Sequence, residues 1–193
     1  KKLSILCCFL PLFAIGQDDF QLWSKVELGY KINKKVSVEL TEGFRLRENA
    51  SLPSKTFTDF NATYKHKKKV RIGTGYRFIQ AFNLAQDIRL RHRWYVDMTL
   101  RQKVKRYQFG FRSRIQHQKG VNHLERYYRG KLSASYNIRK TPLEPTFSIE
   151  SFLNLQSSQF DKFRYTAALS HPLNKKMQAS LYYRVQQEIN VSN

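Results

Sequence analysis

Apolar and polar residues alternate with a period of two along most of the chain, and this alternation constrains the fold more than any other feature. In the first such segment, Leu22 and Val26 fall on one face of an extended strand, whereas Gln21 and Lys25 fall on the other. Alternation sustained over a dozen residues predicts a strand with one apolar and one polar face. Ten segments share the pattern, and none has a helical period: residues 20–32, 36–46, 60–64, 70–78, 88–100, 107–115, 128–138, 147–155, 163–169 and 177–185.

The longest segments suit a membrane better than a soluble core. Soluble strands usually contain about five or six residues, whereas a tilted strand needs about 9–11 residues to cross a bilayer. A closed sheet in lipid pairs all of its backbone groups, with apolar side chains facing outward and polar side chains facing a lumen. We therefore expect an all-β, antiparallel, up-and-down transmembrane β-barrel. Ten strands are visible, and the full protein is expected to have ten or twelve, including any closing strands. The alternative is a soluble secreted β-sandwich that acts as a binding module.

The first residues have the pattern of an export signal. Lys1 and Lys2 precede a short apolar run, and small residues, Ala14 and Gly16, stand at the −3 and −1 positions of a cleavage site. No apolar run reaches the roughly 20 residues of a transmembrane helix. We predict a signal peptide over residues 1–16, a barrel over residues 17–193, and a place in the bacterial outer membrane. Both cysteines lie within the signal peptide, so the exported part has no disulfide and no thiolate site.

The formal net charge of +21 suggests nucleic acid at first sight, but export and the placement of the charges argue against that partner. The polar face carries five acids: Glu27, Glu39, Asp59, Asp97 and Glu150. It also carries Lys25, Lys31, Lys65, Arg101 and Lys131, together with twelve arginines that form the candidate anion-facing cluster: Arg45, Arg47, Arg71, Arg77, Arg89, Arg91, Arg93, Arg112, Arg114, Arg129, Arg164 and Arg184. The apolar face carries almost no charge near strand centres, and its main exceptions are Glu42 and His92.

This Arg- and Tyr-rich lumen has three interpretations. It forms a narrow, anion-favouring channel, it holds an acidic ligand, or its long side chains fill a non-conducting barrel.

A second group of charges lies in the connections. Connections after the odd-numbered segments are predicted to be short and to form a basic rim, whereas those after the even-numbered segments are expected to be mostly longer. The basic rim consists of Lys34, Lys35, Lys67, Lys68, Lys69, Lys103, Lys105, Arg106, Arg139, Lys140, Lys175 and Lys176. Its expected partners are membrane lipid and the phosphates of lipopolysaccharide. A periplasmic N-terminus would turn this rim outward, whereas the usual placing of short turns in the periplasm would turn it inward, so the orientation stays open.

The sequence offers little for catalysis. If residues 102 and 103 form the hairpin turn, Ser113 faces His92 on the lipid side, as a lipid hydrolase would require, but no carboxylate is near to orient the imidazole. The five histidines have no metal-ligand spacing, and Gly73 and Gly75 lie mid-strand, where glycine relieves crowding in a lumen. We therefore predict neither an enzyme nor a cofactor or metal site.

Several segments resemble a known family. They are residues 89–97 (RLRHRWYVD) and 107–117 (YQFGFRSRIQH), together with Trp23, Arg45-Leu46-Arg47 and residues 183–188 (YRVQQE). These segments resemble the uncharacterised outer-membrane β-barrel proteins of Gram-negative bacteria that are known as a domain of unknown function, about two hundred residues long. The resemblance implies an outer-membrane barrel and no established activity or protein partner.

Overall fold

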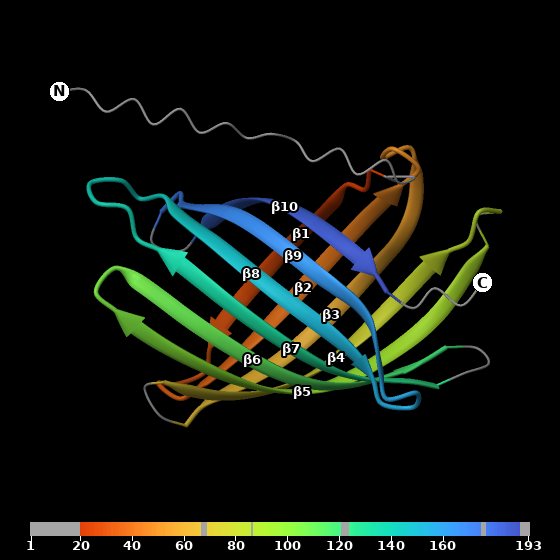
Figure 1. Cartoon of the computed structure of the whole chain (residues 1–193), viewed down its shortest axis with the longest axis horizontal. Coiled ribbons are helices and arrows are strands. Elements are labelled where there is room, and N and C mark those ends of the chain that lie inside the picture. The colour runs from red at the N-terminus through yellow and green to blue at the C-terminus, as the bar shows by residue number, and fades with distance from the viewer. Residues whose placement is uncertain (1–19, 67–68, 86, 121–123, 175–176, 190–193) are drawn as a thin grey trace.

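The computed structural model describes residues 20–66, 69–85, 87–120, 124–174 and 177–189. The predicted signal peptide and four of the basic-rim lysines (Lys67, Lys68, Lys175 and Lys176) lie outside these residues. The described chain consists of strands joined by turns (Figure 1), and it contains no helix that could cross a membrane. The strands are β1 (Trp23–Lys31), β2 (Val36–Arg47), β3 (Leu52–Lys65), β4 (Val70–Phe82), β5 (Ile88–Val104), β6 (Tyr107–Lys119), β7 (Leu124–Tyr136), β8 (Glu144–Asn154), β9 (Gln159–Pro172) and β10 (Gln178–Glu188).

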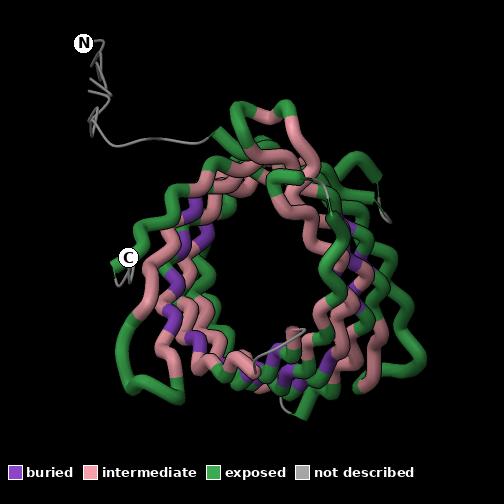
Figure 2. The backbone as a smooth tube through the Cα atoms, turned by 90° about the vertical axis from the view of Figure 1, so that its right-hand side faces the viewer, coloured by how far each residue is buried: buried purple, intermediate pink, exposed green. Residues whose placement is uncertain are grey.

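The ten strands form one antiparallel sheet in chain order, from β1 to β10. Figure 2 shows that this sheet curls round an open centre, as an up-and-down barrel does. The prediction of ten antiparallel strands is confirmed. Among the described residues no backbone ladder joins β10 to β1, and the Tyr182 hydroxyl instead donates a hydrogen bond to the Trp23 carbonyl oxygen at 2.9 Å. We call this junction the seam.

Burial is inverted relative to a soluble protein. In the described part of the chain, the buried residues include eleven polar or charged ones and four large hydrophobic ones, Phe57, Ile79, Tyr95 and Phe152. Outward-facing apolar side chains are widely exposed, and Leu181 is 79% exposed. A β-sandwich packs the apolar faces of two sheets together, whereas this structure has one sheet with its apolar face outward. This arrangement is that of a transmembrane barrel and not of a sandwich.

The turns at both ends of the barrel are short, which corrects the prediction of longer connections on one side. Turns after the even-numbered strands span four or five residues, such as 48–51 and 83–87, and those after the odd-numbered strands span two to seven. Leu52 already belongs to β3, and Lys103 to β5, so the strands extend further than the alternation alone indicated. Turn length therefore does not distinguish the two ends.

The pairing of β5 with β6 also differs from the prediction. The turn consists of Lys105 and Arg106, and Lys105 adopts a left-handed conformation (φ 53°). Ser113 therefore lies opposite Met98, and His92 lies opposite Lys119. The expected pairing of Ser113 with His92 is wrong because the turn comes three residues later than the sequence suggested.

Candidate functional site

The polar faces of all ten strands surround a cavity of about 460 Å³ inside the barrel. Its wall carries the five acids that alternation placed inside, and ten basic side chains: Lys25, Arg45, Arg77, Arg101, Arg112, Arg114, Arg129, Lys131, Arg164 and Arg184. Seven of the twelve candidate arginines are therefore on this wall. The other five do not line the cavity, and they are Arg47, Arg71, Arg89, Arg91 and Arg93. Among these, the Arg93 guanidinium donates to Gln118 Oε1, with its Nε at 3.0 Å.

Glu150 of β8 is the centre of the largest charge network in the interior. Its Oε1 accepts hydrogen bonds from Arg112 Nη2 at 2.6 Å and from Arg129 Nη2 at 2.8 Å, and Arg164 Nη1 lies 3.4 Å from its Oε2. The Glu150 side chain is 7% exposed. Arg129 is further held by Gln116 Oε1, at 2.9 Å. One buried carboxylate thus holds guanidinium groups from three strands, which fixes them against the wall.

A second network crosses β3 to β6. Arg77 Nε donates to Asp59 at 2.6 Å, and the Tyr95 hydroxyl donates to the other oxygen of that carboxylate at 2.7 Å. Arg114 binds Asp97 through two hydrogen bonds of 2.6 Å, and its guanidinium lies 3.7 Å from the centre of the Tyr95 ring. Two ion pairs are therefore linked by one aromatic ring.

Glycine creates the space for that ring. A Cβ atom on Gly75 would lie 2.3 Å from the Cζ and Oη atoms of Tyr95, so only glycine admits the ring at its present position. Gly43 accommodates the ring of Phe57 in the same way, with a Cβ position 2.1 Å from Phe57 Cζ. The sequence predicted that Gly75 relieves crowding in the lumen, and the group that occupies the space beside it is the Tyr95 ring.

The seam has a different composition. Guanidinium groups lie over the Trp23 ring, with Arg45 at 3.6 Å and Arg184 at 4.7 Å from its centroid, and Arg164 further away at 5.5 Å. Arg184 Nε donates to Thr166 Oγ1 at 3.0 Å. We call Trp23, Arg45 and Arg184 the seam cluster. No carboxylate forms an ion pair with either arginine in the described part of the chain.

The wall therefore carries two kinds of cation. Six of the ten basic side chains form ion pairs with Glu27, Asp59, Asp97 or Glu150. Arg101 and Lys131, like the two arginines of the seam cluster, form no ion pair with a described residue. These four cations keep their charge available to a solute in the cavity.

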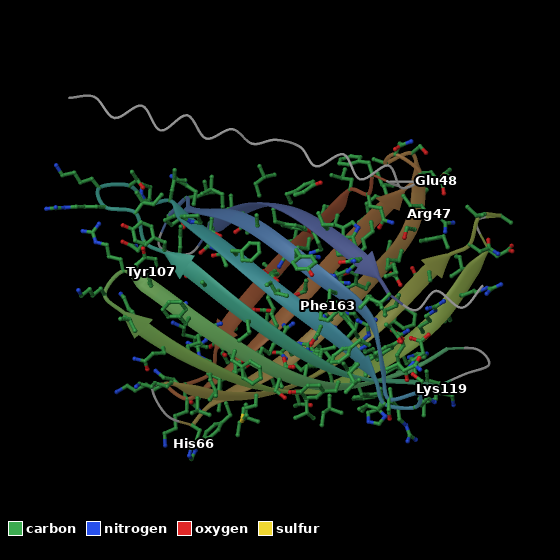
Figure 3. All side chains as sticks on the ribbon, in the orientation of Figure 1. Arg47, Glu48, His66, Tyr107, Lys119 and Phe163 are labelled. Atoms are coloured by element: carbon green, nitrogen blue, oxygen red, sulfur yellow. The ribbon has the colours of Figure 1, made fainter. Side chains whose placement is uncertain are left out.

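The described residues of the basic rim lie together at one end of the barrel. Figure 3 shows His66 and Tyr107 at that end, and Arg47, Glu48 and Lys119 at the other. The turns that contain Lys34, Lys69, Lys105 and Lys140 all follow odd-numbered strands, so an up-and-down barrel brings them to one rim.

The candidate catalytic pair is not assembled. Ser113 and His92 lie six residues out of register, about 20 Å apart along the strands. The Ser113 hydroxyl contacts the Tyr128 hydroxyl at 3.3 Å, and His92 Nδ1 contacts the Tyr76 hydroxyl at 2.6 Å. The described residues also contain no group of three or more His, Cys, Asp or Glu side chains that could hold a metal ion.

Sequence reasoning missed the aromatic residues of the interior. Trp23 and Phe57 line the cavity, and Phe152 is buried beside Arg129, although each is apolar. A register shift between Phe152 and Leu153 accompanies this inward placement in β8. The available signal was parity: Trp23 shares the parity of Lys25 and Glu27 on the polar face of β1.

Comparison with known proteins agrees with this architecture. Residues 20–193 match the family described as "Protein of unknown function (DUF2490)", and the chain belongs to that family. No curated protein sequence matches the chain. Two solved structures are similar, a KdgM porin and a KdgM porin in complex with disordered oligogalacturonate. The first has a TM-score of 0.53 at 10% identity over 89% of this chain and 98% of its own. The second has a TM-score of 0.54 at 12% identity over 89% and 96%. The fold is therefore porin-like, that of an outer-membrane β-barrel.

Proposed function

We propose that this protein is a narrow passage in the bacterial outer membrane that favours small anionic solutes over cations. The observation that carries the proposal is the charge of the cavity wall, with ten basic side chains and five acidic ones. Rings of basic side chains select anions because they lower the energy of a negative solute and raise that of a positive one. Arg45, Arg101, Lys131 and Arg184 supply the charge that no described acid neutralises.

Carboxylate-bearing solutes are the class that fits this wall best. Guanidinium groups bind carboxylates through paired, charge-assisted hydrogen bonds. One similar porin is described in complex with disordered oligogalacturonate, a chain of sugar acids. This likeness supports an acidic solute, and the residues of the wall support it independently.

A second candidate function is that of a filled barrel that does not conduct and acts through its basic rim. The convergence of three arginines on Glu150 favours it, because these side chains occupy interior space. Barrels of about eight strands have interiors just filled by side chains, and ten strands leave little more room.

Recording from the purified protein in planar bilayers separates the two candidates. We expect conductance steps and, under a KCl gradient, a reversal potential displaced toward that of chloride. Replacing Arg45 and Arg184 together by Gln should lower the chloride-to-potassium permeability ratio. A control that replaces the outward-facing Lys119 and Arg126 by Gln removes the same charge and should leave the ratio unchanged. Cation selectivity, or silence of the inserted protein, would contradict the passage.

A further inference from the structure

The turns at the two ends of the barrel carry opposite charge. The described residues of the odd-numbered turns include no acid and seven cations: Lys34, Lys35, Lys69, Lys105, Arg106, Arg139 and Lys140. We call these seven residues the basic collar. The described residues of the turns at the opposite end contain Glu48 and Asp87 and no Lys or Arg. No collar residue forms an ion pair with a described acid.

Backbone hydrogen bonds fix the spacing of the collar. Lys65 N donates to Lys35 O at 2.7 Å, and Arg101 N donates to Lys69 O at 2.8 Å. In the same way Asn137 N donates to Arg106 O at 3.0 Å, which joins two successive turns. The cations are therefore held in neighbouring groups on a rigid rim rather than on separate loops.

The outward face of the barrel places this collar at the level of lipid headgroups. Four tyrosines, Tyr30, Tyr64, Tyr107 and Tyr136, each lie within two residues of a collar turn, and the rings of Tyr107 and Tyr136 are 4.9 Å apart. Tyrosine on the outward face of a barrel marks the boundary between hydrocarbon and headgroups. Cations beside such a ring of tyrosines face the phosphate layer of the bilayer.

The height of the outward-facing apolar band agrees with the placement of the collar at the level of the headgroups. Along β5 the even-numbered, outward-facing parity runs from Val104 to Trp94, which at about 3.3 Å per residue and a tilt of about 40° spans about 25 Å across the bilayer. That height matches the apolar band of outer-membrane barrels, about 25 Å. Beyond Trp94 polar side chains enter the outward face, with His92, Lys119 and Arg126, beside the apolar Leu90 and Ile88 of β5.

Topology indicates which leaflet the collar meets. The described chain enters β1 and leaves β10 at the end opposite the collar (Figure 1). A barrel inserted from the periplasm as hairpins keeps the segment before its first strand on the periplasmic side and carries the odd-numbered turns across. The competing cue, turn length, carries no weight because the turns are short at both ends. The collar then faces the outer leaflet, where lipopolysaccharide carries phosphate groups.

We propose that the basic collar binds the phosphate groups of lipopolysaccharide in the outer leaflet. Each ammonium or guanidinium group forms charge-assisted hydrogen bonds with phosphate oxygens, and the fixed spacing lets neighbouring turns engage one headgroup. This proposal does not depend on conduction through the lumen. Binding of lipopolysaccharide and passage of anions can therefore be tested, and can fail, independently of each other.

Titration of the full chain in a zwitterionic detergent with bis-phosphorylated lipid A tests the proposal. The variant replaces Lys105 by Asn and Arg106 by Gln, because Asn tolerates the left-handed backbone at position 105. Each collar charge contributes about fivefold to affinity at an anionic lipid surface, so removing the pair should weaken binding about 25-fold. The matched control replaces Lys119 and Arg126 by Gln and should bind like the parent protein.

Three further results decide the outcome. Lipid A without phosphates should not bind, and inorganic phosphate at millimolar concentration should not displace lipid A, because the collar requires phosphates presented on one headgroup. An equal loss of binding in the collar and control variants would overturn the proposal, since net charge alone would then explain the affinity. Equal binding of phosphate-free lipid A, or ready displacement by inorganic phosphate, would also overturn it.

Discussion

Two regions of the same interior wall use the same residue type in different ways. Around Glu150 and Asp97, buried carboxylates hold the arginines in ion pairs. At the seam, Arg45 and Arg184 are held by the faces of Trp23 instead, and no described carboxylate neutralises them. A wall arginine with a carboxylate within reach is neutralised and held in the structure of the wall. An arginine without one keeps its charge for a solute.

The largest effect that this difference predicts concerns Glu150. The substitution Glu150→Gln should lower the free energy of unfolding by about 3–5 kcal/mol, because it leaves Arg112, Arg129 and Arg164 buried without a carboxylate. Denaturant unfolding in lipid vesicles measures this loss. The control Glu27→Gln breaks an exposed ion pair with Lys25 and should cost about 1 kcal/mol or less. Equal losses of unfolding free energy in both variants would mean that the buried network contributes no more to stability than the exposed ion pair.

A smaller effect is expected at Gly75. The substitution Gly75→Ala places a methyl group 2.3 Å from the Tyr95 ring and should displace the hydroxyl that binds Asp59. Overpacking of this kind costs about 1–3 kcal/mol, measurable by the same unfolding experiment. Gly29→Ala is the matched control, because its Cβ would meet nothing within 4 Å. If the two alanine variants were equally stable, Tyr95 would not be fixed by its contact with Gly75.

The smallest effect on stability is expected at the seam. Replacing Arg45 and Arg184 by Gln removes two cation–π contacts with Trp23, each contributing about 0.5–1 kcal/mol, but it also relieves repulsion between like charges. The free energy of unfolding should therefore change by about 1 kcal/mol or less, while the permeability ratio falls. A loss as large as that of Glu150→Gln, measured side by side, would remove the distinction between the two regions.

The faces of the strands could be predicted from the sequence, but their register could not. The predicted β5–β6 turn was three residues too early, which moves the partner of each residue by six positions, as for His92 and Lys119. A shift by an even number of residues leaves every side chain on its own face. The inner and outer faces were therefore correct although the pairing of Ser113 was wrong.

For the interior, too, the sequence predicted which residues face inward but not which of them are in contact. Alternation placed Arg112 and Glu150 on the polar face, but they belong to β6 and β8. The register aligns both with Lys131 of β7, and the Arg112 side chain reaches Glu150 across that strand at 2.6 Å. Arg112 is therefore neutralised by a contact between non-adjacent strands. The other paired arginines on the wall meet acids of adjacent strands, and there the register decides which acid is within reach: Arg77, Arg114, Arg129 and Arg164. The inward aromatic residues were missed because an apolar residue on a polar face carries no signal other than parity, as Trp23 illustrates.

The barrel turns the apolar face of every strand toward lipid and the polar face toward the lumen. The two tryptophans test it directly, because Trp94 points outward and is 61% exposed, whereas Trp23 lines the cavity. In vesicles of lipids with brominated acyl chains, the Trp23→Phe variant, which retains only Trp94, should show strongly quenched fluorescence. The Trp94→Phe variant, which retains only Trp23, should be quenched little. Strong quenching of Trp23 by the brominated chains, or no quenching of Trp94, would contradict the account.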